Sequence, residues 1–160
     1  MRAHRPGAGL LAAALVVTHA AAEDVRQVNT CFEEHVAGLR LSQLEQGIAL
    51  CTKVIEDKAA PAGRRGEAFA QRGLMHARRW SVVSEPTSAF QGIADLTEAL
   101  QLHKPAMERR HLLLIIRAQL YAATGQRRRA ADDYELVLKE NPKSIQAKEG
   151  RSRLGLPEGL

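Results

Sequence analysis

Hydrophobic residues recur every three to four positions from about Asp24 to Leu154, which is the period of amphipathic α-helices. The strict alternation that indicates β-strands is almost absent, and the common residues are the helix formers Ala, Leu, Glu, Gln and Arg. Prolines and glycines interrupt the pattern and mark helix ends. The pattern predicts an all-α protein with seven helices, near residues 24–38, 41–58, 63–79, 86–103, 106–123, 127–140 and 143–153.

The chain repeats part of itself at an offset of 45 residues. Two stretches of 27 residues, which begin at Gly47 and at Gly92, align without a gap. This register favours a repeated structural unit over a chance match of helix-forming composition. The seven identities are Gly47/Gly92, Ile48/Ile93, Ala49/Ala94, Thr52/Thr97, Arg64/Arg109, Arg65/Arg110 and Arg72/Arg117.

The segment AQLYAATGQRRRAADDYELVLKENP, residues 118–142, contains a complete helix–turn–helix crossing. Ala118 lies in the middle of one predicted helix and Ala130 near the start of the next. Antiparallel helices approach closely only where both side chains are small, so these alanines are expected at the crossing. Tyr121 and Tyr134 are expected to fill the space beside it.

This segment resembles the tetratricopeptide repeat family, whose unit of roughly 34 residues is a helix–turn–helix with small residues at the crossing, aromatic residues around it and a closing proline. Pro142 stands at the closing position. The resemblance implies a right-handed stack of antiparallel helix hairpins, an α-solenoid with about three repeats. The last predicted helix would be the polar cap that such a stack needs.

A second unit with the same features extends from Phe69 to Pro105. Gly73 and Gly92 take the two small positions, and Leu96 and Ala99 belong to the core of the second helix. A first unit is less regular: the stretch EQGIALCTKVIED fits a second helix, whereas TCFEEHVAGL lacks the expected aromatic and small residues.

The middle unit is longer than the third. Gly73 and Gly92 are 19 residues apart, against 12 from Ala118 to Ala130, so the middle unit carries about seven extra residues. We expect them in the stretch ARRWSVVSEPT, as a loop that exposes Trp80. A Trp in such a loop is a common anchor for a partner, but it can equally fold back onto the stack as a plug. The sequence leaves both roles open.

The first 22 residues follow the order of a secretory signal peptide. Two arginines precede an apolar run from Leu10 to Val17, and small residues follow. The run is about half of the roughly 20 residues that a membrane-spanning helix needs. We predict cleavage after Ala22, with Ala20 as the second choice and an uncleaved anchor as the alternative. Residues 23–160 would then form one exported domain, most simply in a bacterial periplasm, with eukaryotic secretion as the alternative.

Charge gives little support to a nucleic-acid partner. The formal net charge of +5 falls to +3 when the signal peptide and its two arginines are removed. The basic residues alternate with acidic ones, and Trp80 has no aromatic neighbours for stacking on bases. Paired arginines, such as Arg64 with Arg65, are better explained as a solvated face than as an anion site, although a polyanion binder remains an alternative.

Two cysteines, Cys31 and Cys51, remain in the exported chain. An even count in an oxidising compartment favours a disulfide, which we expect between the two helices of the first hairpin. The alternative is a pair of buried free thiols.

The resemblance implies that a partner binds the inner face of the first helix of each hairpin. The Lys and Asn set with which some family members clamp a carboxylate is absent, which indicates a more apolar groove. The expected partner-binding positions are Gln71, Leu74, Arg78, Ile115, Gln119 and Ala122, with Trp80 from the insertion.

No nucleophile elbow, phosphate loop or paired acid and base is present in the sequence, and the histidines lack metal-ligand spacing. We therefore expect no cofactor, no metal and no catalysis. The predicted function is a protein-interaction module that binds another protein or peptide segment. The alternative is an enzymatic or cell-wall-binding helical domain, for which Glu33, Glu34 and His35 are the only cluster worth testing.

Overall fold

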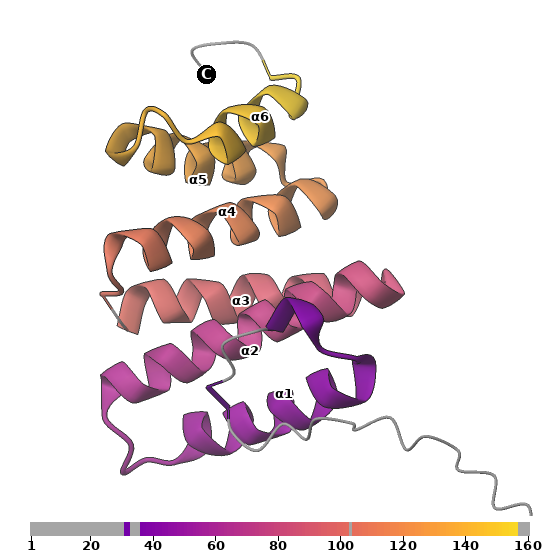
Figure 1. Ribbon diagram of the computed structural model, residues 1–160, viewed down its shortest axis with the longest axis vertical. Coiled ribbons are helices and arrows are strands. Elements are labelled where there is room, and N and C mark those ends of the chain that lie inside the picture. Colours follow the sequence, from indigo (N-terminus) through magenta and orange to yellow (C-terminus); the bar gives the residue numbers. More distant parts are fainter. Residues whose placement is uncertain (1–30, 33–35, 103, 157–160) are drawn as a thin grey trace, which may run out of the picture.

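The computed structural model describes residues 31–32, 36–102 and 104–156. This part of the chain contains a short 3₁₀ turn, six α-helices and no strand, so the prediction of an all-α protein is confirmed. Successive helices pack as antiparallel pairs that follow one another along the long axis of the molecule (Figure 1). The elements are η1 (Val36–Gly38), α1 (Leu41–Glu56), α2 (Ala62–Val83), α3 (Pro86–Leu102), α4 (Met107–Ala123), α5 (Arg127–Glu140) and α6 (Ile145–Arg153).

Two predicted helix boundaries are wrong. Most of the predicted helix 24–38 lies outside the described residues, but Cys31 and Phe32 are not helical and only the single turn η1 follows them. The helix expected at 63–79 continues to Val83, so the extra residues of the middle unit lengthen α2 instead of forming a loop. No breaker occurs before Ser84, which ends α2 in the left-handed conformation with φ of 54°.

Glycine allows α2 and α3 to come close together. A Cβ atom added to Gly92 would lie 3.3 Å from the carbonyl oxygen of Gly73 and 2.8 Å from Cδ1 of Leu120. A Cβ atom on Gly73 would lie 2.8 Å from Cγ of Leu96, which is fully buried together with Ala99. The two helix backbones therefore pack directly against each other at this point.

Between α4 and α5, alanine takes the position that glycine takes between α2 and α3. Ala118 and Ala130 are fully buried in one cluster with Tyr121 and Tyr134. α6 covers this cluster at Gly150, where an added Cβ would overlap the ring of Tyr134. Pro142, by contrast, is exposed in the turn after α5.

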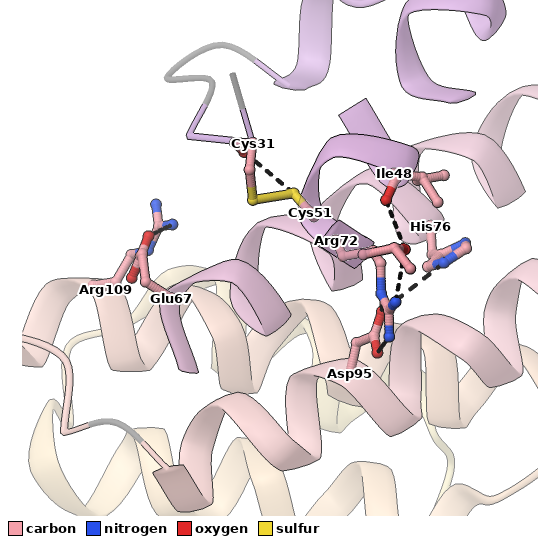
Figure 2. The surroundings of a disulfide bond; sticks show 9 residues. Cys31, Ile48, Cys51, Glu67, Arg72, His76, Asp95 and Arg109 are labelled. Atoms are coloured by element: carbon pink, nitrogen blue, oxygen red, sulfur yellow. Dashed lines mark hydrogen bonds and ion pairs between the residues drawn. A yellow bond between two sulfur atoms is a disulfide. The ribbon is translucent and has the colours of Figure 1, made fainter. Parts of the chain in front are cut away.

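A half-buried arginine connects three successive helices. Arg72 on α2 donates to both carboxylate oxygens of Asp95 on α3, each at 2.8 Å, and to the hydroxyl oxygen of Thr52 on α1 at 2.9 Å. Figure 2 shows Arg72 between these helices, with His76 beside Asp95. Thr52 in turn donates to the carbonyl oxygen of Ile48, so its hydroxyl both accepts and donates a hydrogen bond.

The next hairpin repeats this network. Arg117 on α4 donates to both oxygens of Asp133 on α5, at 2.7 and 2.8 Å, and to the hydroxyl of Thr97 on α3 at 3.0 Å. The identities Thr52/Thr97 and Arg72/Arg117 in the sequence repeat thus have a physical cause. We call the two arginines with their threonine and aspartate partners the Thr-Arg-Asp ladder.

A weaker third step lies at the C-terminal end. Arg151 on α6 is 34 residues after Arg117 and donates to the carboxylate of Glu135 on α5 at 3.2 Å. Glu135 stands two residues after Asp133, as Thr97 stands two residues after Asp95. α6 therefore makes the contact that the first helix of a further hairpin would make.

Candidate functional site

A groove of about 600 Å³ lies between α2, α4 and η1. The two helices are the first members of consecutive pairs, and η1 packs against α2 (Figure 1). Its volume is in the range of sites that hold a ligand or a few anchoring side chains. The residues that line it are Val36, Ala37, Gly38, Gln71, Leu74, Ala77, Arg78, Trp80, Ser81, Arg109, Leu112, Ile116, Gln119 and Leu120.

α2 supplies one wall through residues three to four positions apart. Gln71, Leu74, Arg78 and Ser81 follow one helical face, and Trp80 joins them near the end of the helix. Arg78 donates from Nη1 to the hydroxyl of Ser81 at 3.3 Å. Its Nε is buried and makes no hydrogen bond among the described residues.

α4 supplies the facing wall in the same way. Arg109, Leu112, Ile116 and Gln119 form a stripe with spacings of three and four residues, and Leu112 is 42% exposed. Arg109 donates to Glu67 of α2 at 2.7 Å, which connects the two helices at the rim (Figure 2). An exposed leucine in a concave site is an available apolar contact.

The third wall is η1, and a disulfide precedes it. Cys31 is bonded to Cys51 in the middle of α1, with Cα atoms 4.6 Å apart, so the predicted disulfide is confirmed (Figure 2). Its placement was predicted wrongly, because Cys31 lies in a bend and not on a helix. The bond therefore ties an irregular segment to α1 and does not cross-link two helices of one hairpin.

Most of the expected partner-binding residues come together at this groove. Gln71, Leu74, Arg78, Trp80 and Gln119 all line it, although Gln71 is only 5% exposed. Trp80 is half-buried and also packs against the core of α2, α3 and α4, so both suggested roles describe part of its environment.

Ile115 does not line the groove. It is 6% exposed and belongs to the cluster of Tyr121, Ala130 and Tyr134 between α4 and α5. Ile116, one position later and about 100° further around the helix, takes the expected place. Ala122 likewise packs against the α4–α5 cluster instead of the groove.

The charged groups among the described lining residues are Arg78 and Arg109, and Arg109 is paired with Glu67 at the rim. The described lining contains no carboxylate. The rest is mainly apolar, with the amides of Gln71 and Gln119. This combination suits a ligand with apolar groups and a negative charge.

His76 lies outside the groove and is suited to packing. It is 7% exposed, its Nε2 is 3.9 Å from Asp95, and burial lowers its pKa more than the attraction of Asp95 raises it. At the other surface, hydrogen bonds from His111 and Arg110 lower the pKa of Glu140.

Some of the predicted features fall on residues that the structure does not describe. The signal peptide 1–22 and the residues Glu33, Glu34 and His35 lie outside the described residues. Within the described ranges, no three His, Cys, Asp or Glu side chains cluster as a metal site requires, and no helix has the length and apolar character of a membrane span. The disulfide is consistent with an extracytoplasmic compartment.

Comparisons of the chain with protein-family models, with curated proteins and with solved structures find no match.

Proposed function

We propose that this protein is a non-catalytic interaction module of the bacterial periplasm, in which the groove between α2, α4 and η1 binds a segment of another protein. The observation that carries the proposal is the convergence of Gln71, Leu74, Arg78, Trp80 and Gln119 on one groove. A preformed site of this kind binds with little ordering cost on the receptor side.

The repeated architecture supports the proposal. The Thr-Arg-Asp ladder recurs from hairpin to hairpin, and Arg151 follows Arg117 at 34 residues, which is the length of a tetratricopeptide unit. We propose that the hairpins form a right-handed tetratricopeptide-like stack with α6 as its cap. Such stacks present their inner helices as extended binding surfaces.

The chemistry of the lining selects the partner. Leu74, Leu112, Ile116 and Trp80 offer apolar contacts, and Arg78 carries a positive charge. The occupant is a peptide segment with one or two large apolar side chains and an adjacent carboxylate. Burial of the apolar groups provides the affinity, and the arginine fixes the orientation.

Site-directed photocrosslinking tests this function. A benzoylphenylalanine replaces exposed Gln119 in the groove, and the matched control replaces exposed Gln146 on α6. In the exporting cell we expect one defined adduct from position 119 and none from position 146. The adduct should disappear when Leu112→Asp is added. Equal adducts from both positions, or none from either, would contradict the proposal.

A further inference from the structure

One wall of the groove comes from a segment with little regular structure of its own. Val36, Ala37 and Gly38 form a single 3₁₀ turn, none of them is buried, and their own backbone hydrogen bond is the local one from Leu39 to Val36 at 3.1 Å. Val36 packs against the cluster of Leu39, Leu44 and Met75, but Ala37 and Gly38, which also line the groove, are exposed. The position of the turn therefore depends also on what holds its two ends.

Two anchors flank the turn. On the C-terminal side, Leu39 is 5% exposed and packs in a cluster with Leu44, Ala68 and Met75 of α1 and α2. On the N-terminal side, Cys31 is bonded to Cys51, and the two cysteines are 3% and 0% exposed. Without the bond, the described chain before η1 would lose its covalent cross-link to Cys51 in the middle of α1.

We propose that the Cys31–Cys51 disulfide positions η1 as a wall of the groove, so that the site reaches its full affinity only after oxidation of the chain. This inference rests on the proposed function of the groove and adds its regulation. The step is thiol–disulfide exchange with a protein disulfide oxidant: the two cysteine thiols form one S–S bond, and the oxidant becomes a dithiol that takes up their two protons and two electrons.

The burial of both sulfur atoms sets the direction of this control. A reductant reaches a buried disulfide poorly, so the bond acts once, during maturation, and does not switch repeatedly. A chain that still lacks the bond would present α2 and α4 without the third wall. It would therefore bind its partner weakly until it has been exported and oxidised.

An aromatic sulfonate, anilinonaphthalene sulfonate, is a suitable probe for the groove, because its rings match the apolar lining and its charge matches Arg78 and Arg109. Trp80 is the only Trp of the chain and lines the groove, so energy transfer from Trp80 reports bound probe, and the part of the signal that Leu112→Asp removes reports the groove. In Cys31→Ala/Cys51→Ala we expect binding about tenfold weaker, which corresponds to the loss of about 1.4 kcal/mol from one or two small apolar contacts.

A double-mutant cycle separates positioning from a general loss of stability. Ala37 lines the groove and is exposed, and Ala37→Glu places a negative charge beside the anionic probe, with Ala37→Gln as the uncharged control. In the oxidised chain we expect Ala37→Glu to weaken probe binding about tenfold relative to Ala37→Gln. In the disulfide-free chain, where the wall is released, the two substitutions should differ by less than about twofold.

Two controls complete the test. Val137→Ala, in the α4–α5 cluster, lowers stability with the disulfide intact and should leave probe binding unchanged. All variants are compared in an osmolyte that keeps them fully folded. The inference is overturned if the disulfide-free chain binds the probe as tightly as the oxidised one, or if Ala37→Glu has the same effect in both backgrounds. The photocrosslinking test is independent of this outcome, so failure of the wall and failure of the proposed function remain distinguishable.

Discussion

Arg117 on α4 and Asp133 on α5 form a two-point ion pair whose side chains are only 14% and 4% exposed. Burial opposes the charge on Arg117, but its hydrogen bonds and attraction to Asp133 outweigh this effect and raise its pKa. Asp133→Ala would leave the buried guanidinium without its counter-charge. We expect the free energy of unfolding to fall by about 3–5 kcal/mol, as measured by urea denaturation.

A matched double variant separates the net contribution of the ion pair to the free energy of unfolding from the penalty of leaving one charge unpaired. Arg117→Met/Asp133→Leu removes both charges and should be at least about 2 kcal/mol more stable than Asp133→Ala. A double variant as unstable as the single one would mean that the pair itself, and not the unpaired charge, dominates.

Gly73 tests the close approach of α2 and α3. In Gly73→Ala the new methyl group would lie 2.8 Å from Cγ of buried Leu96 and 3.2 Å from Cβ of Asp95. The packing cost of about 1–3 kcal/mol exceeds the helix-propensity gain of at most about 1 kcal/mol, so a net destabilisation of about 1 kcal/mol is expected in chemical denaturation. Gly38→Ala, where no atom lies within 4 Å of the added Cβ, should be nearly neutral. Equal effects at both positions would argue against a tight crossing.

Ile115 and Ile116 are neighbours in the sequence with different environments. Ile115→Ala creates a cavity in the α4–α5 cluster and should cost about 2–4 kcal/mol of stability while leaving probe binding in the groove intact. Ile116→Ala removes part of the groove wall, so it should weaken probe binding with a smaller loss of stability. Thermal unfolding and probe titration of the two variants check this, and an exchanged pattern would show that the groove is assigned to the wrong face.

Protonation of His76 should weaken the fold. Burial lowers its pKa below the ordinary value of 6.5 despite Asp95, and Arg72 and Arg79 lower it further. The unfolded chain therefore binds a proton first as the pH falls, so the free energy of unfolding decreases as the pH falls through the ordinary pKa of 6.5. The lowered pKa of Glu140 acts at more acidic pH and does not contribute in this window.

The control replaces His76 by the residue at the corresponding position of the next unit, which is Tyr121 at the repeat offset of 45 residues. His76→Tyr should flatten the dependence of the urea midpoint on pH over the same range. An unchanged slope would place the responsible proton on another group.

The disulfide should also contribute to stability directly. It closes a loop with a sequence separation of 20 residues. By the loop-entropy estimate, Cys31→Ala/Cys51→Ala should lower the free energy of unfolding by about 3 kcal/mol. Calorimetry of the oxidised protein and of the double variant measures the difference, and identical melting temperatures would refute it.

The sequence predicts the helices of the α3–α5 region well, because Pro86, Pro105, Gly125 and Pro142 mark their ends. It fails at the end of α2, where a typical repeat length suggested a loop but the residues before Ser84 contain no breaker. The helix continues to Val83 because no residue before Ser84 disfavours a helix, although a typical repeat unit would have ended earlier.

Only some of the residues that line the groove can be predicted from the sequence. The positions on α2 follow from helical spacing, but on α4 an error of one residue exchanges Ile116 for the buried Ile115. The wall formed by η1 depends on a cross-link to α1 and has no periodic signal. Asp95 and Asp133 do have a signal, since each stands three residues after a small crossing residue, but their importance emerges only when their arginines are placed beside them.

The Thr-Arg-Asp ladder means that further helix hairpins could be added to the chain by protein engineering. The α2–α3 hairpin presents Thr97 toward the helix that follows and Arg72 toward the helix that precedes, so an additional copy of this unit, inserted before Met107, would meet matching partners on both sides. A longer engineered array with several grooves in series could therefore be built from this chain without redesigning the contacts between its units.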